Sequence, residues 1–210
     1  PNVLNQSLLA KSSATQNVLD TWTAPPGIEV TQIVGWGLDT VRGIRYDDCH
    51  LLLCSHTLGN LDRQLLFVDD GDGTVVVPSA NKMDGAKTYY VNLFKYNDTH
   101  FPDRSHASIL EVEPVKDLVT SIIKDNVGTT LPNDITPTKP PADEGKRLRF
   151  RIHSPVSLDL YDANGNHTGL ITTTTPGDFR RFEANIPNSY YREFGEVKYA
   201  GADGSSPTTV

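Results

Sequence analysis

Hydrophobic and polar residues alternate with different periods along this chain, and these periods predict helices and strands. Apolar residues recur at roughly helical spacing over 2–19 and again over 107–124, which predicts two helices. Runs rich in β-branched and aromatic residues predict strands at 28–36, 50–53, 64–68 and 87–94. Strand, loop and helix recurring in this order indicate the α/β class.

A strict alternation of apolar and polar positions replaces this pattern in the last third of the chain. Residues 147–152 (RLRFRI) and 156–161 (VSLDLY) both alternate, as strands with one buried face do. Asn164-Gly165 follows, a strong signal for a hairpin turn. We therefore expect a small antiparallel, β-sandwich-like accessory domain over 146–210. Its last residues again favour a strand, so we expect this domain to be truncated.

Residues 129–145 (TTLPNDITPTKPPADEG) separate these two regions. The segment contains four prolines and almost no apolar side chain. Such a composition predicts an extended linker rather than part of a packed core. The chain is therefore expected to consist of an α/β region over 1–128, this linker, and the accessory β-domain.

The charge and composition of the chain exclude several function classes. The formal net charge is −7; residues 1–144 carry 11 basic and 19 acidic side chains, and residues 145–210 carry 8 and 7. Neither part has the basic excess that nucleic-acid binding requires, so no nucleic-acid partner is expected. No apolar run reaches the length of a membrane-spanning helix, and two cysteines are too few for a disulfide scaffold.

Asp72 is the first candidate for chemistry. It lies in a glycine-flanked turn, 69–74 (DDGDGT), between two apolar runs. Glycines permit a tight turn, and the end of a strand is where α/β sheets present functional groups. Two other interpretations fit the same spacing, namely a solvated hairpin turn and a loose cation site formed by Asp69, Asp70 and Asp72.

His106 is the second candidate. It lies in a polar loop (RSHAS) between a β-rich segment and an amphipathic helical pattern. A general base must reach out of a loop whose backbone is held by a rigid element, and this position meets that condition. A surface or helix-capping histidine is the alternative. His100 is a local competitor, but no helix follows it directly.

Taken together, these residues resemble the C-terminal half of an α/β-hydrolase. GDGTV around Asp72, then a strand, then an H-x-x-I-L segment starting at His106, is similar to one lipase and acyltransferase branch. That branch includes lecithin:cholesterol acyltransferase and GPI-inositol-deacylase-like proteins. Residues 33–46 (IVGWGLDTVRGIRY) are similar to its strand and G-x-G-x-x-T turn before the acid. The resemblance covers about residues 25–125.

This resemblance implies a Ser-His-Asp triad. Asp72 would orient His106 and stabilise its imidazolium, and His106 would act as general base and then as general acid. It also implies that 1–128 is a partial α/β-hydrolase domain, in which 1–24 corresponds to a lid or cap helix. The implied activity is that of a carboxylic ester hydrolase (lipase or esterase) or an acyltransferase, working through an acyl-enzyme without a metal or another cofactor.

The family's nucleophile elbow, G-x-S-x-G, has no counterpart in the sequence. Ser55, Ser79 and Ser105 all lack the flanking glycines. We therefore expect the nucleophile upstream of residue 1, on a segment of the same precursor or on a docked chain, and this chain alone is not expected to turn over an ester. The expected partners are that hydrolase segment and an ester or lipid substrate, with peripheral membrane contact, in a secreted or cell-envelope protein.

Since the nucleophile is missing, a function from another class stays open. The chain could be a non-catalytic surface or assembly protein that retains hydrolase architecture and binds through its β-domain. Reading the residues encoded upstream would discriminate the two hypotheses, because an elbow there favours the enzyme.

Two other groups of residues favour structural roles. Cys49, His50, Cys54 and His56 include metal-ligand types, but a strand would point positions 49 and 54 to opposite faces, so buried structural thiols are expected. Residues 162–166 (DANGN) resemble the start of a Ca²⁺ loop without its distal glutamate, and a plain hairpin turn is the better interpretation.

Overall fold

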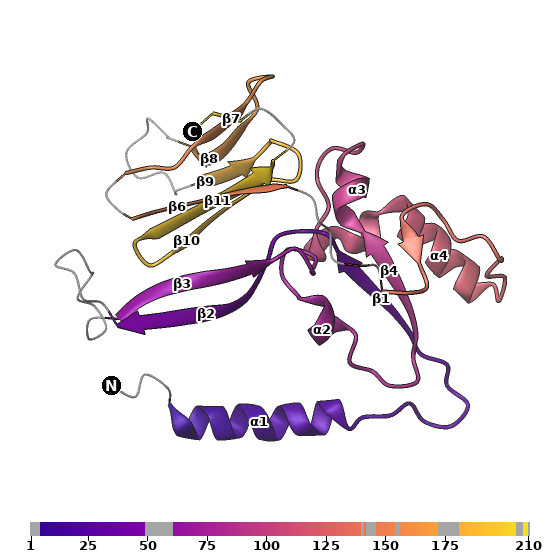
Figure 1. The fold of residues 1–210 in the computed structure, drawn as a ribbon. Coiled ribbons are helices and arrows are strands. Elements are labelled where there is room, and N and C mark those ends of the chain that lie inside the picture. The colour runs from indigo at the N-terminus through magenta and orange to yellow at the C-terminus, as the bar shows by residue number, and fades with distance from the viewer. Residues whose placement is uncertain are drawn as a thin grey trace.

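The computed structural model describes residues 5–48, 61–139, 141, 146–153, 156–171, 181–204 and 208–209. Within these ranges the chain is a mixed α/β protein (Figure 1). The N-terminal part contains helices and a sheet with a parallel strand pair, and the C-terminal part contains antiparallel sheets. The α/β class and the antiparallel C-terminal region predicted from the sequence are therefore confirmed at this level.

The sheet of the N-terminal part is formed by β1 (Thr31–Trp36), β4 (Lys87–Asn92) and β5 (Ile135–Thr136), counting described residues only. β1 and β4 run parallel in an unbroken register, and β5 pairs antiparallel to β4. Val34 and Val91 are fully buried, as expected of apolar strands covered on both faces. Because β1 and β4 are parallel, the loops after them leave the same edge of the sheet.

The helix predicted over 107–124 is interrupted in the structure. A 3₁₀ helix, η2 (His106–Glu111), is followed by α4 (Glu113–Ile123), and Val112 between them is extended. The break has a clear cause, because Pro114 lacks an amide hydrogen and fits only the first turn of a helix. His106 therefore stands at the start of a short helix of its own.

The main core lies between β4 and α4, and α3 (Leu93–Asn97) extends it directly after β4. The amphipathic pattern of α4 turns one face onto the sheet, while its opposite face is exposed. The buried members of this core are Tyr89, Val91, Leu93, Tyr96, Val112, Val115, Leu118 and Ile135.

An antiparallel hairpin projects between the end of β1 and the acidic turn. It consists of β2 (Thr40–Asp48) and β3 (Leu61–Val68), and a short helix, α2 (Val77–Ala80), follows the acidic turn. β3 contains the strand predicted at 64–68. The strand predicted at 50–53 lies outside the described residues.

The C-terminal part consists of two antiparallel sheets in the described residues. One sheet contains, in spatial order, β10 (Tyr190–Phe194), β11 (Val197–Asp203) and β6 (Arg147–His153). The other contains, in spatial order, β12 (Thr208–Thr209), β7 (Leu160–Asp162), β8 (His167–Ile171) and β9 (Arg181–Ala184). Their shared core is formed by Leu158, Leu160, Ile186, Ala200 and Ala202.

The sheet β10-β11-β6 is covered on both faces. Along β10, Tyr191 packs into the core between the two C-terminal sheets, whereas Tyr190 stacks on Phe67 of β3 at 5.1 Å between ring centroids. In β11, Ala200 faces the first core and Tyr199 packs on the hairpin. The C-terminal part is therefore packed against the β2–β3 hairpin, and Figure 1 shows the two side by side.

Part of the segment predicted as a linker belongs to the first sheet. β5 lies within it, and the side chain of Ile135 is buried in the main core. Lys139 Nζ lies 3.0 Å from Asp70 Oδ2, which ties this segment to the acidic turn. Residues 140 and 142–145 lie outside the described ranges.

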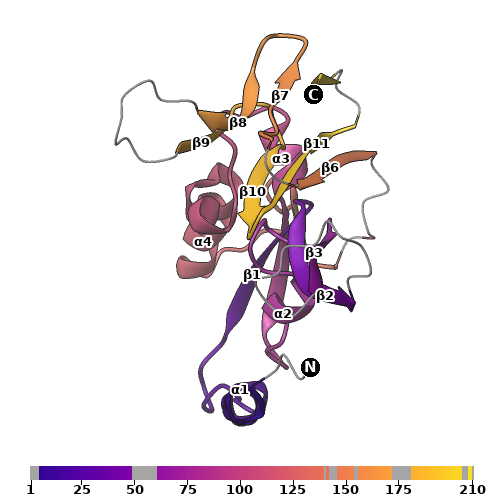
Figure 2. The same cartoon turned by 90° about the vertical axis from the view of Figure 1, so that its left-hand side faces the viewer.

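α1 (Gln6–Asp20) lies apart from the other elements (Figures 1 and 2), and none of its residues is buried. Asn5 caps it by accepting hydrogen bonds from two backbone amides of its first turn. Its apolar side chains are exposed. No helix among the described residues is long and apolar enough to cross a membrane.

Candidate catalytic dyad

Asp72 and His106, 34 positions apart, form a hydrogen-bonded pair. His106 Nδ1 lies 2.8 Å from Asp72 Oδ2. The Asp72 side chain is 7% exposed and the His106 side chain is 50% exposed. The acid is thus shielded from solvent while the other side of the imidazole ring remains accessible.

The second carboxylate oxygen of Asp72 is held by its own turn. Asp72 Oδ1 accepts hydrogen bonds from the amides of Thr74 at 3.0 Å and Val75 at 2.7 Å. The backbone carbonyl of Asp72 accepts a hydrogen bond from the amide of His106 at 2.9 Å. The acid turn and the histidine loop are therefore joined through both backbone and side chain.

The G-x-G-x-x-T segment noted in the sequence surrounds this turn. A Cβ built on Gly35 would stand 2.9 Å from the Cβ of Asp72, so only glycine allows the acid turn to lie this close to β1. Gly37 donates its amide to the carbonyl of Asp69, and the hydroxyl of Thr40 accepts from the amide of Gly73 at 2.8 Å. The motif therefore holds the acid turn in place, by close packing at Gly35 and by hydrogen bonds from Gly37 and to Thr40.

The loop that carries His106 is fixed by Asn97, a residue that no pattern in the sequence singles out. Asn97, at the end of α3, is buried and bonds the backbone of Arg104 in both directions, at 3.1 and 2.8 Å. Ser105 then caps η2 through a reciprocal capping box with Ser108. The pattern S-x-x-S is the signal that could have indicated this cap.

The hydrogen bond to Asp72 determines what His106 can do chemically. A carboxylate accepting at Nδ1 stabilises the tautomer with a proton there, which leaves Nε2 as the basic atom. In the described part of the chain, no side chain forms a hydrogen bond with His106 Nε2. The dyad is arranged to receive a proton from a nucleophile brought to that nitrogen.

The other sequence candidates do not join this site. His100 is exposed, stacks on Tyr96 and bonds the carbonyl of the same residue. Asp70 pairs with Lys139 rather than gathering with Asp72 around a cation. No group of three or more His, Cys, Asp and Glu side chains in the described ranges is arranged to hold a metal ion.

Two further groups stand out in the sequence, the 162–166 segment and the cluster around Cys49 and Cys54. Asp162 Oδ1 accepts from the amides of Asn164 and Asn166, so the 162–166 segment is a hydrogen-bonded hairpin turn. The cluster expected around Cys49 and Cys54 lies outside the described residues.

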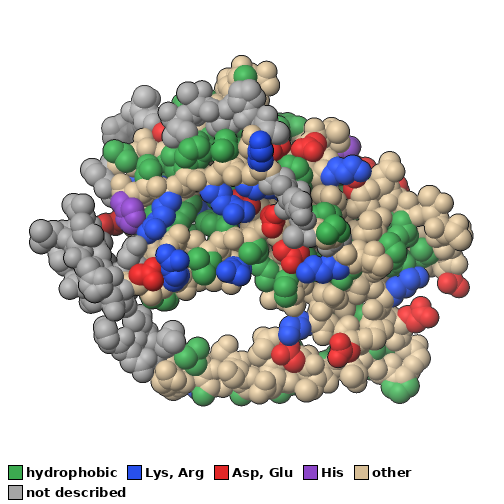
Figure 3. All heavy atoms as spheres, viewed as in Figure 1, with side chains coloured by type: hydrophobic (Ala, Val, Ile, Leu, Met, Phe, Trp, Pro, Cys, Tyr) green, Lys and Arg blue, Asp and Glu red, His purple; other side chains and the backbone are tan. Residues whose placement is uncertain are grey.

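A cavity of about 420 Å³ adjoins the dyad, between its two loops and the C-terminal sheets. Gly73 and Ser105, the neighbours of the two dyad residues, line one side, and Tyr191 and Arg192 line the other. Figure 3 shows Lys and Arg side chains gathered between the β2–β3 hairpin and the C-terminal sheets. The dyad therefore lies beside the junction of the two parts.

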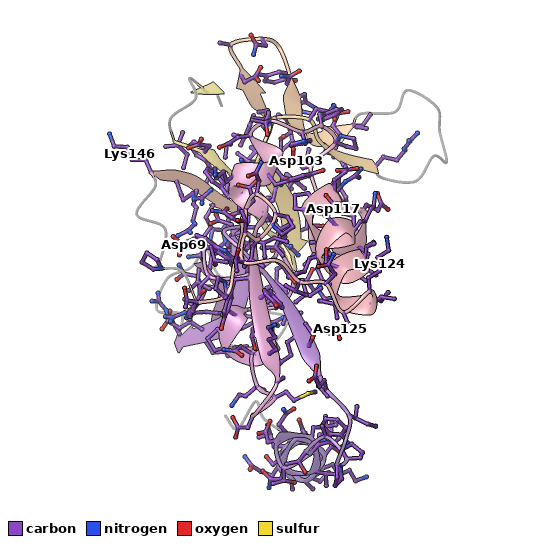
Figure 4. The ribbon with its side chains drawn as sticks, turned by 90° about the vertical axis from the view of Figure 1, so that its right-hand side faces the viewer. Asp69, Asp103, Asp117, Lys124, Asp125 and Lys146 are labelled. Atoms are coloured by element: carbon purple, nitrogen blue, oxygen red, sulfur yellow. The ribbon has the colours of Figure 1, made fainter. Side chains whose placement is uncertain are left out.

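Asp103 is a partly buried acid at this junction, where Figure 4 shows it close to α3. Burial, reinforced by the charge of Asp98, raises its pKa to about 6, although the amide of Asn188 donates to Asp103 Oδ2 at 2.6 Å. Its other oxygen, Oδ1, has no hydrogen-bond partner among the described residues. Asp103 is thus a group whose charge can change near pH 6.

No family model, no curated protein and no solved structure matches this chain.

Proposed function

We propose that this chain supplies the acid and the histidine of a Ser-His-Asp triad, and that the assembled protein is a carboxylic ester hydrolase or acyltransferase. Asp72 would orient His106 and stabilise its imidazolium, and Nε2 would take the proton of a serine hydroxyl. The proton would then pass to the leaving alcohol, giving an acyl-enzyme that water or a second alcohol resolves. The substrate class is an ester, with lipid esters included.

The observation that carries this proposal is the geometry of the dyad. A buried carboxylate holds Nδ1 of a half-exposed imidazole at 2.8 Å, and Nε2 has no partner in the described ranges. A purely structural role would account for the hydrogen bond at Nδ1 but not for a half-exposed ring whose Nε2 has no partner in the described residues. The arrangement is instead what proton transfer at Nε2 requires.

The position of the dyad in the fold supports a hydrolase-like architecture. Leu38, the second residue after β1, forms a parallel bridge with Asp72, so the acid turn lies beside the continuation of that strand. The β2–β3 hairpin is inserted between β1 and the acid. His106 follows the neighbouring parallel strand β4, and ligands of open α/β sheets bind at this carboxyl edge. We propose that the first part is the C-terminal half of an α/β-hydrolase sheet, with α1 as a cap helix.

The nucleophile is proposed to come from a segment preceding residue 1 or from a docked chain. The test uses the chain together with the coding sequence upstream of it, assayed on p-nitrophenyl esters and with a fluorophosphonate probe that labels activated serines. Asp72→Asn is expected to lower kcat by about 10⁴-fold and His106→Ala by about 10⁶-fold. His100→Ala is the matched control and should keep full activity, because His100 lies outside the dyad.

The same assay distinguishes the enzyme from the rival function, a non-catalytic surface or assembly protein. Absence of both labelling and turnover in the assembled wild-type protein would favour the non-catalytic surface or assembly protein. Turnover that survives His106→Ala would contradict the triad assignment while leaving some other enzymatic activity in place.

A further inference from the structure

The C-terminal part meets the dyad edge through arginines that alternate along its strands. In β6 the apolar side chains face the core between the C-terminal sheets, so the arginines point the opposite way, onto the N-terminal part. Arg147 donates to the carbonyl of Gly37 at 2.9 Å. Arg149 binds the carboxylate of Asp39 through two hydrogen bonds, at 2.8 and 2.6 Å. Both contacts fall on the loop that follows β1.

A third arginine touches the acid turn itself. Arg192, in β10, lies on the same face as Tyr190, and its Nη2 donates to the carbonyl of Gly73 at 2.5 Å. Arg192 forms no ion pair within the described ranges, so its charge is directed at this carbonyl. Hydrogen bonds from a charged donor are about twice as strong as neutral ones. Gly73 is the residue directly after the acid.

Because the peptide unit is planar, the hydrogen bond from Arg192 also constrains the amide that binds Asp72. The carbonyl of Gly73 and the amide of Thr74 belong to one trans peptide unit and point in opposite directions. Arg192 holds the carbonyl end, and the amide end donates to Asp72 Oδ1 at 3.0 Å. On the other side of Gly73, Thr40 accepts its amide. Because Gly73 has a φ of +89°, the turn is a tight one that these two contacts hold in place.

We propose that Arg192 is a positioning residue for the dyad, so that the C-terminal part is a working component of the site rather than a separate binding module. By fixing the Gly73–Thr74 peptide, Arg192 fixes Asp72 Oδ1 and hence the direction of Asp72 Oδ2 toward His106. The role as a positioning residue rests on the proposed function, but the contact itself can be tested without turnover.

The test observes the proton on His106 Nδ1 directly in the chain as it stands. A proton held between imidazole and carboxylate gives a far-downfield ¹H NMR signal, which Asp72→Asn should abolish and thereby assign. Arg192→Met keeps the aliphatic stem but removes every donor, and it is expected to lose the signal. Arg149→Met is the matched control, because it removes a junction contact without touching the Gly73 peptide. It should keep the signal.

Folding of each variant is checked by thermal unfolding. If Arg192→Met does not fold, Arg192→Gln serves as a second variant with the same expected loss, because its amide nitrogen ends two bonds short of the terminal guanidinium nitrogen that binds Gly73. A signal that persists in a folded Arg192 variant overturns the proposal. Loss in both Arg192→Met and Arg149→Met also overturns it, because docking in general would then hold the dyad. A wild-type protein without the signal would contradict the dyad and so the proposed function as well.

Discussion

The backbone of Gly35 lies directly against the side chain of Asp72. A Cβ added to Gly35 would stand 2.9 Å from Asp72 Cβ, 2.9 Å from Leu93 Cδ1 and 3.1 Å from Ile109 Cδ1. These neighbours come from the acid turn, from the start of α3 and from η2. Gly35 is therefore the point at which the strand, the acid and the histidine helix come closest together.

Gly35→Ala is expected to displace the acid turn. The methyl group meets Asp72 and Leu93, which are buried, and Ile109, which is partly buried, so overpacking should destabilise the fold by about 1–3 kcal/mol and weaken the Asp72–His106 hydrogen bond. Urea unfolding and the downfield proton signal of His106 measure the two effects. Gly43→Ala is the control, since a Cβ there meets nothing within 4 Å. A Gly35→Ala protein as stable as Gly43→Ala, with the signal intact, would contradict this account of the close approach.

Asp72 and His106 could be selected from the sequence as candidates because their signals are local. The glycines around Asp72 and the polar loop before His106 indicate where each side chain stands. Of the β2–β3 hairpin, the pattern predicts the second strand but not its pairing with β2 or its packing against the C-terminal part, which involves residues far apart in the sequence. The pattern over 107–124 predicts helix correctly but not the break in it, because η2 ends at Glu111 and Pro114 lies in the first turn of α4.

The junction between the two parts could not be predicted either. Strict alternation in 147–152 predicts a strand with one apolar and one basic face, and a basic face usually lies in solvent. Here that face docks on the carbonyl of Gly37 and on the carboxylate of Asp39, and each contact joins residues 110 positions apart. The position of Arg192 beside the acid turn follows from this docking, so no short-range pattern marks it.

A buried hydrogen bond of Tyr199 supports the docking of the hairpin. Its hydroxyl accepts the amide of Leu65 at 3.1 Å, and both side chains are buried. Tyr199→Phe leaves that amide without a partner, which should lower the free energy of unfolding by about 1–3 kcal/mol. Tyr46→Phe, on the exposed face of the same hairpin, should change it by less than about 0.5 kcal/mol in the same urea titration. Equal effects in the two variants would show that the Tyr199 hydroxyl contributes nothing.

Asp103 makes the junction sensitive to pH. Burial raises its pKa from 3.8 to about 6. The folded protein then binds the proton more tightly than the unfolded chain, so stability is greatest when Asp103 is protonated and falls as pH rises from about 4 to about 6. After allowance for solvent screening the loss should be of the order of 1–2 kcal/mol.

Asp103→Asn should remove this part of the pH dependence, because an amide oxygen can still accept the Asn188 amide but carries no charge. Unfolding free energies measured at steps between about pH 4 and pH 7 test it. Asp117→Asn, on the exposed side of α4 (Figure 4), is the control and should leave the slope unchanged. A wild-type slope retained by Asp103→Asn would assign the pH dependence to another group.

His167 provides a second pH-dependent contribution within the C-terminal sheets, which is also lost as pH rises but at a higher pH. Its Nδ1 lies 2.5 Å from Glu183 Oε1 and its Nε2 lies 3.0 Å from Asp159 Oδ1. Only the imidazolium can donate from both nitrogens at once. Burial lowers the pKa of His167, but the hydrogen bonds to Glu183 and then Asp159 outweigh it, and the net direction is upward from 6.5.

Because the folded pKa is raised, the stabilisation is complete below about pH 6.5 and is lost as pH rises through the folded value. His167→Gln is therefore expected to lower stability by roughly 1 kcal/mol at about pH 5.5, after allowance for solvent screening, and by less at about pH 8.5. His153→Gln, at the exposed end of β6, is the matched control and should not change the shape of the profile. Thermal unfolding across this range distinguishes the two variants. A His167→Gln deficit of the same size at both ends of the range would mean that packing against Tyr161, rather than the imidazolium, accounts for the effect.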